Sequence, residues 1–214
     1  MQGSNKKRPV ASKKGKAQDC ASAMHAKGMP SPESLLSIDL SGHYPPIDVI
    51  DSSIKDCALC EKLSLSSNTI DKIQNLPTPS LKVLSLGRNC IKKLDGIQQV
   101  HDSLEQLWIS YNNIDKLQGI EEMHQLKVLY MSNNKIADWE EIDRLSGLTR
   151  LTDVLFVGNP LHTKYKKKNM LKEYEREMTK RLPGLKKLDG HILTEEHESS
   201  DDGQEAQAGR ECHT

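Results

Sequence analysis

Cys57 and Cys60 are the residues whose types and spacing most readily suggest chemistry, because a Cys-x-x-Cys pair can supply half of a tetrahedral zinc site. No second pair completes such a site, and the eight histidines are scattered without ligand spacing. The five cysteines are an odd number and follow no disulfide framework, which is typical of a reducing compartment. We therefore predict no metal, and interpret both residues as small buried side chains at the start of a repeat.

Catalytic motifs are missing from the sequence. It contains no phosphate-binding G-x-x-x-x-G-K-[ST] loop, no dinucleotide-binding G-x-G-x-x-G, no H-E-x-x-H helix and no G-x-S-x-G elbow. We therefore expect neither an enzyme nor a bound cofactor.

One basic run could bind an acidic polymer. It consists of Lys164, Lys166, Lys167 and Lys168, with Lys172 a little further along. Such a cluster could contact a microtubule surface or RNA, although a merely solvated helix face would have the same composition.

The elements that would position these residues follow from an internal repeat of the form L-x-x-L-x-L-x-x-N-x-I/L. Five copies align. Their asparagines lie 21, 23, 22 and 25 residues apart, at Asn68, Asn89, Asn112, Asn134 and Asn159. A degenerate copy precedes them at Leu35, Ile38 and Leu40, and a half copy at 185–190 follows. Atypical terminal copies are expected, because they must close the core against water.

This pattern predicts an α/β leucine-rich-repeat solenoid. The L-x-L stretch of each copy should form a short parallel strand on the concave face, with short helices on the convex face. The asparagine is suited to satisfy backbone groups where the strand turns away. Residues 164–182 have apolar residues at offsets of three and four before Pro183, which predicts a C-terminal cap helix.

The charge distribution divides the chain into three parts. Residues 1–30 contain seven Lys or Arg and one Asp, a net charge of +6, and we predict a basic, mostly disordered leader with a weak helix over Ala17–Lys27. Residues 191–214 contain seven Asp or Glu and one Arg, a net charge of −6, and we predict an acidic, mostly disordered tail. Residues 31–190 would form the solenoid. No run of 18 apolar residues exists, so we expect no contact with a membrane interior.

The candidate functional residues alternate with the buried leucines and should face outward from the sheet. Since parallel strands stack about 4.8 Å apart, Trp108, Tyr130 and Leu155 should form a ladder. Val83 and Val128 would flank it, and Tyr111 would lie beyond the strand end. The alternative is that these are scattered exposed apolar residues of no significance. Because they are contiguous, and because Trp and Tyr are frequent interface anchors, we predict a partner-binding strip that accepts a helix or helical module.

Several strings within residues 35–190 make the sequence similar to one family. They are Ser85-Leu86-Gly87-Arg88-Asn89, Leu107-Trp108-Ile109-Ser110-Tyr111-Asn112, Val128-Leu129-Tyr130-Met131-Ser132-Asn133-Asn134, Trp139-Glu140-Glu141-Ile142-Asp143, Gly158-Asn159-Pro160-Leu161 and 181–190. These resemble the leucine-rich-repeat light chains of axonemal outer-arm dynein, and they include outward-facing residues that core packing does not require.

The resemblance implies a non-catalytic subunit in the cytoplasm and cytoskeleton, within the axoneme of a cilium or flagellum. It implies a monomeric light chain that binds the microtubule-binding region of an axonemal dynein heavy chain through its apolar sheet face, contacts tubulin, and regulates motility. Two segments depart from the family: the leader lacks the longer amphipathic helix, and residues 191–198 are more acidic. We therefore carry over no residues from 191–198.

A different class of function stays open at this point. A nuclear or splicing leucine-rich-repeat adaptor, or a phosphatase regulator, would share the repeat, although nucleic acid is not an expected partner of the sheet face itself. Such proteins do not share the strings around Trp108 and Tyr130.

Overall fold

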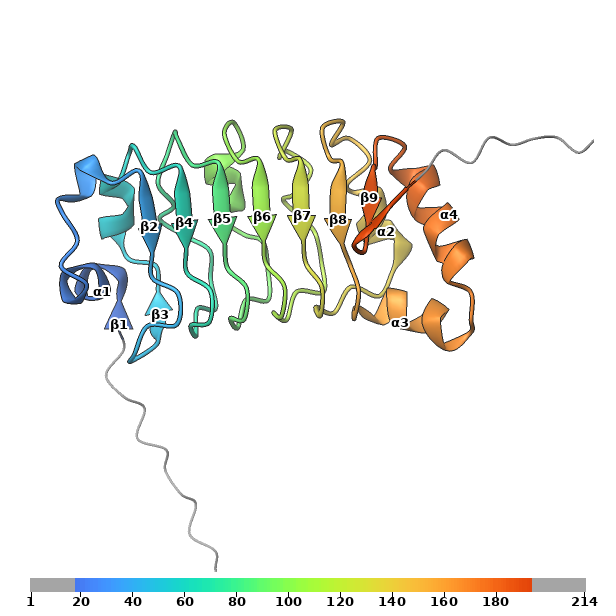
Figure 1. Ribbon diagram of the computed structural model, residues 1–214, viewed down its shortest axis with the longest axis horizontal. Coiled ribbons are helices and arrows are strands. Elements are labelled where there is room, and N and C mark those ends of the chain that lie inside the picture. Colours follow the sequence, from blue (N-terminus) through green and yellow to red (C-terminus); the bar gives the residue numbers. More distant parts are fainter. Residues whose placement is uncertain (1–17, 194–214) are drawn as a thin grey trace, which may run out of the picture.

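A computed structural model describes residues 18–193 as one curved solenoid of stacked coils (Figure 1). Each coil contributes one short strand to an eight-stranded sheet, in the order β10-β9-β8-β7-β6-β5-β4-β2. All neighbours are parallel except β9 and β10, which form a terminal antiparallel pair. The strands are β2 (Ser37–Asp39), β4 (Lys62–Ser64), β5 (Val83–Ser85), β6 (Gln106–Trp108), β7 (Val128–Tyr130), β8 (Asp153–Leu155), β9 (Lys187–Leu188) and β10 (His191–Ile192).

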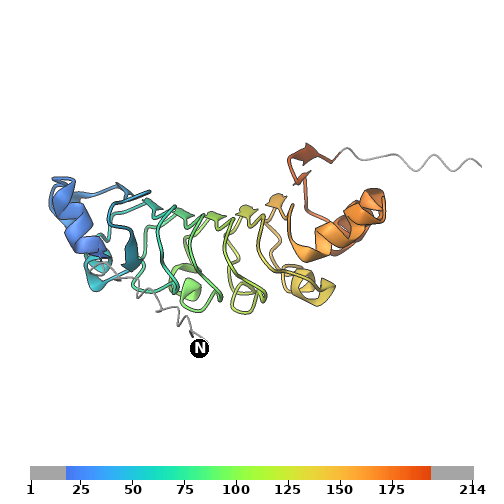
Figure 2. The same ribbon diagram turned by 90° about the horizontal axis from the view of Figure 1, so that it is seen from below.

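The repeat pattern explains the core. The central residue of each strand is buried, as Leu84, Leu107 and Leu129 show, while its two neighbours along the strand face the other side of the sheet. No coil could bury its leucines alone, so the stacked coils bury them jointly in one continuous core. The sheet lines the inner side of the curve, and the connecting segments form its outer side (Figure 2). The predicted leucine-rich-repeat fold is confirmed.

The repeated asparagines form a ladder inside the coils. Asn112 is 7% exposed, and its Oδ1 accepts a hydrogen bond from the Ile91 amide at 3.0 Å. Its Nδ2 donates to the carbonyls of Leu86 at 2.9 Å and Ile109 at 3.1 Å. The other asparagines repeat this arrangement, so each side chain ties its own turn to the preceding coil. The predicted role of the asparagines is confirmed.

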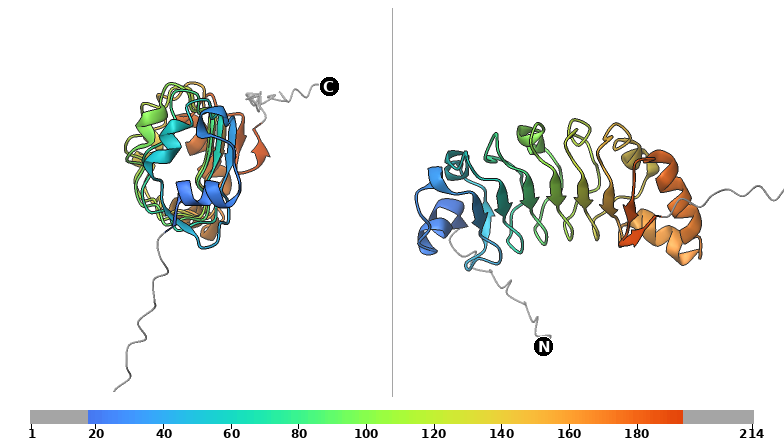
Figure 3. Two further views of the ribbon diagram at one scale, coloured as in Figure 1. Left: turned by 90° about the vertical axis from the view of Figure 1, so that its left-hand side faces the viewer. Right: turned by 45° about the horizontal axis from the view of Figure 1, so that its top comes forward.

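The outer side contains less α-helix than the repeat pattern predicted. Of the five connections between β2 and β8, two contain a 3-10 helix, one contains the α-helix α2 (Trp139–Asp143), and two turn without a helix. The two 3-10 helices span Ser52–Asp56 and Ile97–Val100, and a further one, Pro32–Ser34, precedes β2. Seen end-on, the connections lie nearly over one another (Figure 3).

The prediction of a mostly disordered leader was wrong for residues 18–30, although a helix does form within the expected range 17–27. Residues 18–30 do not lie outside the solenoid: β1 (Gln18–Asp19) pairs with β3 (Ile47–Val49), and α1 (Cys20–Ala26) covers the first coil. The short helix begins at Asp19, whose carboxylate accepts the Ser22 amide at 2.8 Å. Cys20, Ala23 and Met24 are buried, so few but well-placed apolar residues suffice for a lid. The predictions for residues 1–17 and 194–214 lie outside the described residues.

The C-terminal cap consists of two helices and not of one helix over 164–182. These are α3 (Pro160–Lys167) and α4 (Leu171–Arg181). Asn169 adopts a φ of 57° between them, a left-handed conformation that ends α3. Tyr174 and Met178 of α4 pack into the core, as the apolar spacing predicted. Within residues 18–193, no helix is both long and apolar enough to cross a bilayer.

Candidate partner-binding surface

The sheet register brings the predicted ladder together. Trp108 lies opposite Tyr130 in the β6–β7 pair, and Tyr130 lies opposite Leu155 in the β7–β8 pair. All three project from the concave face, because each alternates with a buried core residue. We call these three residues the apolar strip.

The two rings of the strip support one another. The Trp108 and Tyr130 rings are stacked, with centroids 6.2 Å apart and planes 20° apart. The Tyr130 hydroxyl donates to Asp153 Oδ2 at 2.9 Å, and that carboxylate also lies 3.5 Å from Lys187 Nζ. Partial burial and the adjacent Asp153 raise the pKa of the Tyr130 phenol, so that it remains a neutral donor. The rings are therefore held in place before any partner binds.

The outward orientation of the strip is confirmed, but the strip exposes less apolar area than three free side chains would. Trp108 is 42% exposed, whereas Tyr130 and Leu155, which are neighbours across β7 and β8, are both half-buried. In the neighbouring column, Gln106 lies between Val83 and Val128. The two valines therefore flank the strip separately and do not form a continuous apolar row.

Tyr111 lies beyond the strand end, as predicted, and is 48% exposed. Its φ is 59°, and its amide donates to the Ser132 carbonyl at 2.8 Å. The guanidinium of Arg88, from the preceding coil, lies 4.4 Å from the Tyr111 ring centroid. Sequence reasoning missed Arg88 and Asp153 as functional candidates. The repeat alignment that placed Tyr111 just before Asn112 also places Arg88 at the equivalent position of the preceding coil, and so could have identified Arg88.

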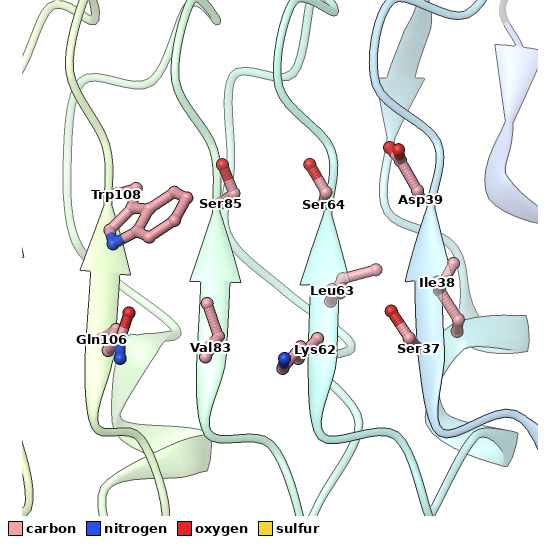
Figure 4. Close-up of a pocket in the computed structure, with 10 residues that line it drawn as sticks. All are labelled: Ser37, Ile38, Asp39, Lys62, Leu63, Ser64, Val83, Ser85, Gln106 and Trp108. Atoms are coloured by element: carbon pink, nitrogen blue, oxygen red, sulfur yellow. The ribbon is translucent and has the colours of Figure 1, made fainter.

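A groove lined by both polar and apolar side chains adjoins the strip on its N-terminal side (Figure 4). Figure 4 shows the Trp108 indole leaning toward Ser85, with Ser64 and Asp39 on the next two strands. The groove has a volume of about 360 Å³. The Ser85 hydroxyl of the groove pairs with the Ser66 hydroxyl, which lies outside the lining, at 2.7 Å. Toward the N-terminus, the concave face thus presents serine hydroxyls among apolar side chains.

The basic run lies on the cap, away from the sheet face. Lys164, Lys166 and Lys167 occupy the last turn of α3, and Lys168 ends it. All four are exposed, and none forms an ion pair with another described residue. Cations at a helix C-terminus also interact favourably with the helix dipole, which gives them a structural role in any case.

The cysteines occupy core positions. Cys57 and Cys60 are both fully buried, as interpreted from the sequence, and burial raises the pKa of Cys57 to about 11. Among residues 18–193, no three His, Cys, Asp or Glu side chains gather as a metal ion would require. The concave face is therefore the site of interest.

Comparison with known proteins gives the family. Residues 102–144 match a family model described as leucine-rich repeats in two copies. The solved structure of a leucine-rich-repeat protein from Leptospira interrogans aligns with a TM-score of 0.57 at 24% identity, covering 72% of this chain and 37% of that one. Dynein axonemal light chain 1 of Chlamydomonas reinhardtii is 51% identical over 72% of this chain and 78% of its own length. The human protein of that name is 49% identical over 79% of this chain and 88% of its own length. At these identities and coverages, the chain belongs to the axonemal dynein light chain 1 family.

Proposed function

We propose that this chain is a light chain of axonemal outer-arm dynein that binds the microtubule-binding region of a heavy chain through the apolar strip, and so regulates ciliary or flagellar motility. Its place would be the axoneme of a cilium or flagellum. A light chain of this family is a non-catalytic subunit, which agrees with the prediction that the chain is not an enzyme. One observation supports the docking mode above all: Trp108 and Tyr130 are pre-stacked on an open face of the sheet.

The shape of the strip favours a helical partner. The strip runs across the strands, from β6 to β8, on the inner side of the curved sheet (Figure 2). A helix laid along it would bury one apolar stripe against Trp108, Tyr130 and Leu155. The pre-formed stacking lowers the entropy that the side chains lose on binding, which compensates for their modest exposed area.

The exposed lysines of the cap support a second contact. Because the heavy chain would be held at its microtubule-binding region, a basic face beside it would lie near the acidic surface of tubulin. We therefore assign Lys164, Lys166, Lys167 and Lys168 to a possible microtubule contact. The microtubule-binding region of the heavy chain is called the stalk head below. Replacing all four lysines by glutamine should weaken co-sedimentation of the complex of light chain and stalk head with microtubules at low salt. The affinity of the light chain for the stalk head should stay unchanged.

Tagged wild-type chain, expressed in ciliated cells, tests the proposed function. We expect the tag to appear along cilia, to vanish from cilia that lack outer arms, and to recover an axonemal heavy chain from ciliary extract. A chain in which Trp108 and Tyr130 are both alanine should recover much less heavy chain. Nucleoplasmic staining with recovery of splicing proteins, or recovery of a phosphatase, would instead support an adaptor of another class.

A further inference from the structure

One charged residue stands in the column of turns that follow the carboxyl ends of the strands. In each coil, the residue before the buried asparagine turns the chain with a positive φ between 53° and 84°. Four of these five residues are neutral, and only Arg88 is charged. The column consists of Ser67, Arg88, Tyr111, Asn133 and Gly158.

At the opposite rim, at the amino ends of the strands, two pairs of charges neutralise each other. Glu61 of one coil pairs with Lys82 of the next at 2.8 Å, and Glu105 pairs with Lys127 at 2.9 Å. Here coil stacking places opposite charges side by side. Arg88 differs, because no ion pair or side-chain hydrogen bond joins it to any residue within 18–193.

The Arg88 guanidinium is nevertheless held in position. The Tyr111 ring covers one of its faces at 4.4 Å. The Tyr111 backbone is fixed by its left-handed φ and by its bond to Ser132. A stacked guanidinium keeps its N–H edge free for a bidentate acceptor, and less side-chain entropy is lost when that acceptor binds. A flexible surface lysine would offer neither property.

The aromatic ring of Tyr111 is not needed to form its turn. A positive φ is common to all five turns of the column, and Asn133 and Gly158 adopt it without the steric cost that a bulky residue has. Coil stacking therefore does not require an aromatic ring at this turn, and the ring is available to position Arg88.

We propose that Arg88, positioned by Tyr111, binds a carboxylate of the protein that covers the apolar strip. Arg88 lies three residues beyond Ser85, toward which the Trp108 indole leans (Figure 4). The partner would thus present an Asp or Glu beside its apolar stripe, and this single charge pair would fix which way the partner runs across the sheet. This inference rests on the proposed function and adds the chemistry of the partner.

Calorimetric titration with a recombinant stalk head of an axonemal dynein heavy chain tests the proposal. R88Q should raise the dissociation constant about tenfold, since the bond is charge-assisted, and should make the affinity less dependent on salt. R88K keeps the positive charge but loses the planar pair of N–H donors of the guanidinium, and should recover only part of the affinity. R150Q serves as the matched control, because Arg150 is an exposed arginine remote from the strip that pairs only with Gln125. R88E should then be combined, one at a time, with single substitutions of stalk-head Asp or Glu residues by Lys. One of these combinations should restore the affinity, and it identifies the partner residue of Arg88.

The outcomes separate the two proposals. If R88Q binds as R150Q does while W108A binds weakly, Arg88 contacts no carboxylate and the docking strip stands. If W108A binds as wild type does, or the wild-type chain does not bind the stalk head, the proposed docking fails and the role of Arg88 fails with it. Circular dichroism should show all of these variants folded, because each change lies on the surface.

Discussion

Asn112→Ala should destabilise the solenoid clearly, although it removes only one small side chain. The change leaves the buried Ile91 amide without a partner. It also removes one of the two side-chain hydrogen bonds that the carbonyls of Leu86 and Ile109 each accept, and these carbonyls keep the bonds from Asn89 and Asn134. An unsatisfied buried group costs about 1–3 kcal/mol. Each lost hydrogen bond to a carbonyl that stays satisfied costs about 0.5–1.5 kcal/mol, and some water can reach the gap because Asn112 is 7% exposed, so we expect a total loss of about 2–4 kcal/mol. Small domains are stable by only about 5–15 kcal/mol.

Urea unfolding followed by circular dichroism measures this loss, with thermal unfolding as a check. The melting temperature should fall by about 4–16 °C, since one kcal/mol corresponds to about 2–4 °C for a chain of this size. Asn113→Ala is the matched control, because the neighbouring Asn113 side chain forms no hydrogen bond with any residue in 18–193. A loss below about 1 kcal/mol for Asn112→Ala, or one equal to that of the control, would refute the assigned role of the ladder.

Asn112→Asp sharpens the same test through its pH dependence. The Asn112 side-chain amide donates to the Leu86 carbonyl, so a buried aspartate at this position would face that carbonyl oxygen. Both burial and the carbonyl should raise the pKa of the new aspartate. When the folded-state pKa of an acid is raised, its destabilising effect grows as the pH rises above the unfolded-state pKa. The variant should therefore be closer to wild type in stability at pH 4 than at pH 8.

Three further changes test other parts of the structure. Burial would raise the pKa of Glu141, but its hydrogen bond from the backbone and its cationic partners outweigh burial and lower the pKa. Glu141→Gln should therefore cost about 1–2 kcal/mol of stability at pH 7. In urea unfolding, the difference from wild type should close as the pH falls below about 4. Gly96→Ala should cost at least about 2 kcal/mol more than Gly119→Ala in thermal unfolding, because both have φ above 90° but only at the first would the new methyl meet a backbone carbonyl. Tyr130→Phe keeps the stacked ring and loses the bond to Asp153, so titration with the stalk head should show at most about a threefold loss of affinity. Equal costs at the two glycines, or a pH-independent effect at Glu141, would contradict these assignments.

Much of the site was predictable because the repeat is periodic. Once the L-x-L stretches were aligned, alternation along each strand and stacking between strands placed Trp108 beside Tyr130 and Tyr130 beside Leu155. The asparagine ladder followed from the same alignment, because a side chain with both a donor and an acceptor recurs at every turn. Periodicity fixes which residues are neighbours without any knowledge of distances.

Features outside the repeat were harder to predict. The lid at Cys20–Ala26 has only three buried side chains, and its order depends on pairing between β1 and β3, which local sequence does not reveal. The break between α3 and α4 depends on one residue, Asn169, in a run that otherwise has helical periodicity. The stacking of Arg88 on Tyr111 joins two side chains of unlike type, so a search for apolar residues passed over it.

The affinity of the doubly substituted chain, Trp108→Ala with Tyr130→Ala, for the heavy-chain stalk head tests the central claim most directly. Trp108 alone exposes 42% of its surface, about 100 Å² of mostly apolar area that a partner would cover. We predict a loss of at least about 30-fold in affinity, as for an interface hot spot, with the melting temperature nearly unchanged because both rings lie outside the core. Tyr44→Ala, which removes a 91% exposed aromatic ring at the far end of the solenoid, should bind as wild type does. A folded double variant whose affinity stays within twofold of wild type would contradict the claim that the concave face of this light chain holds its partner.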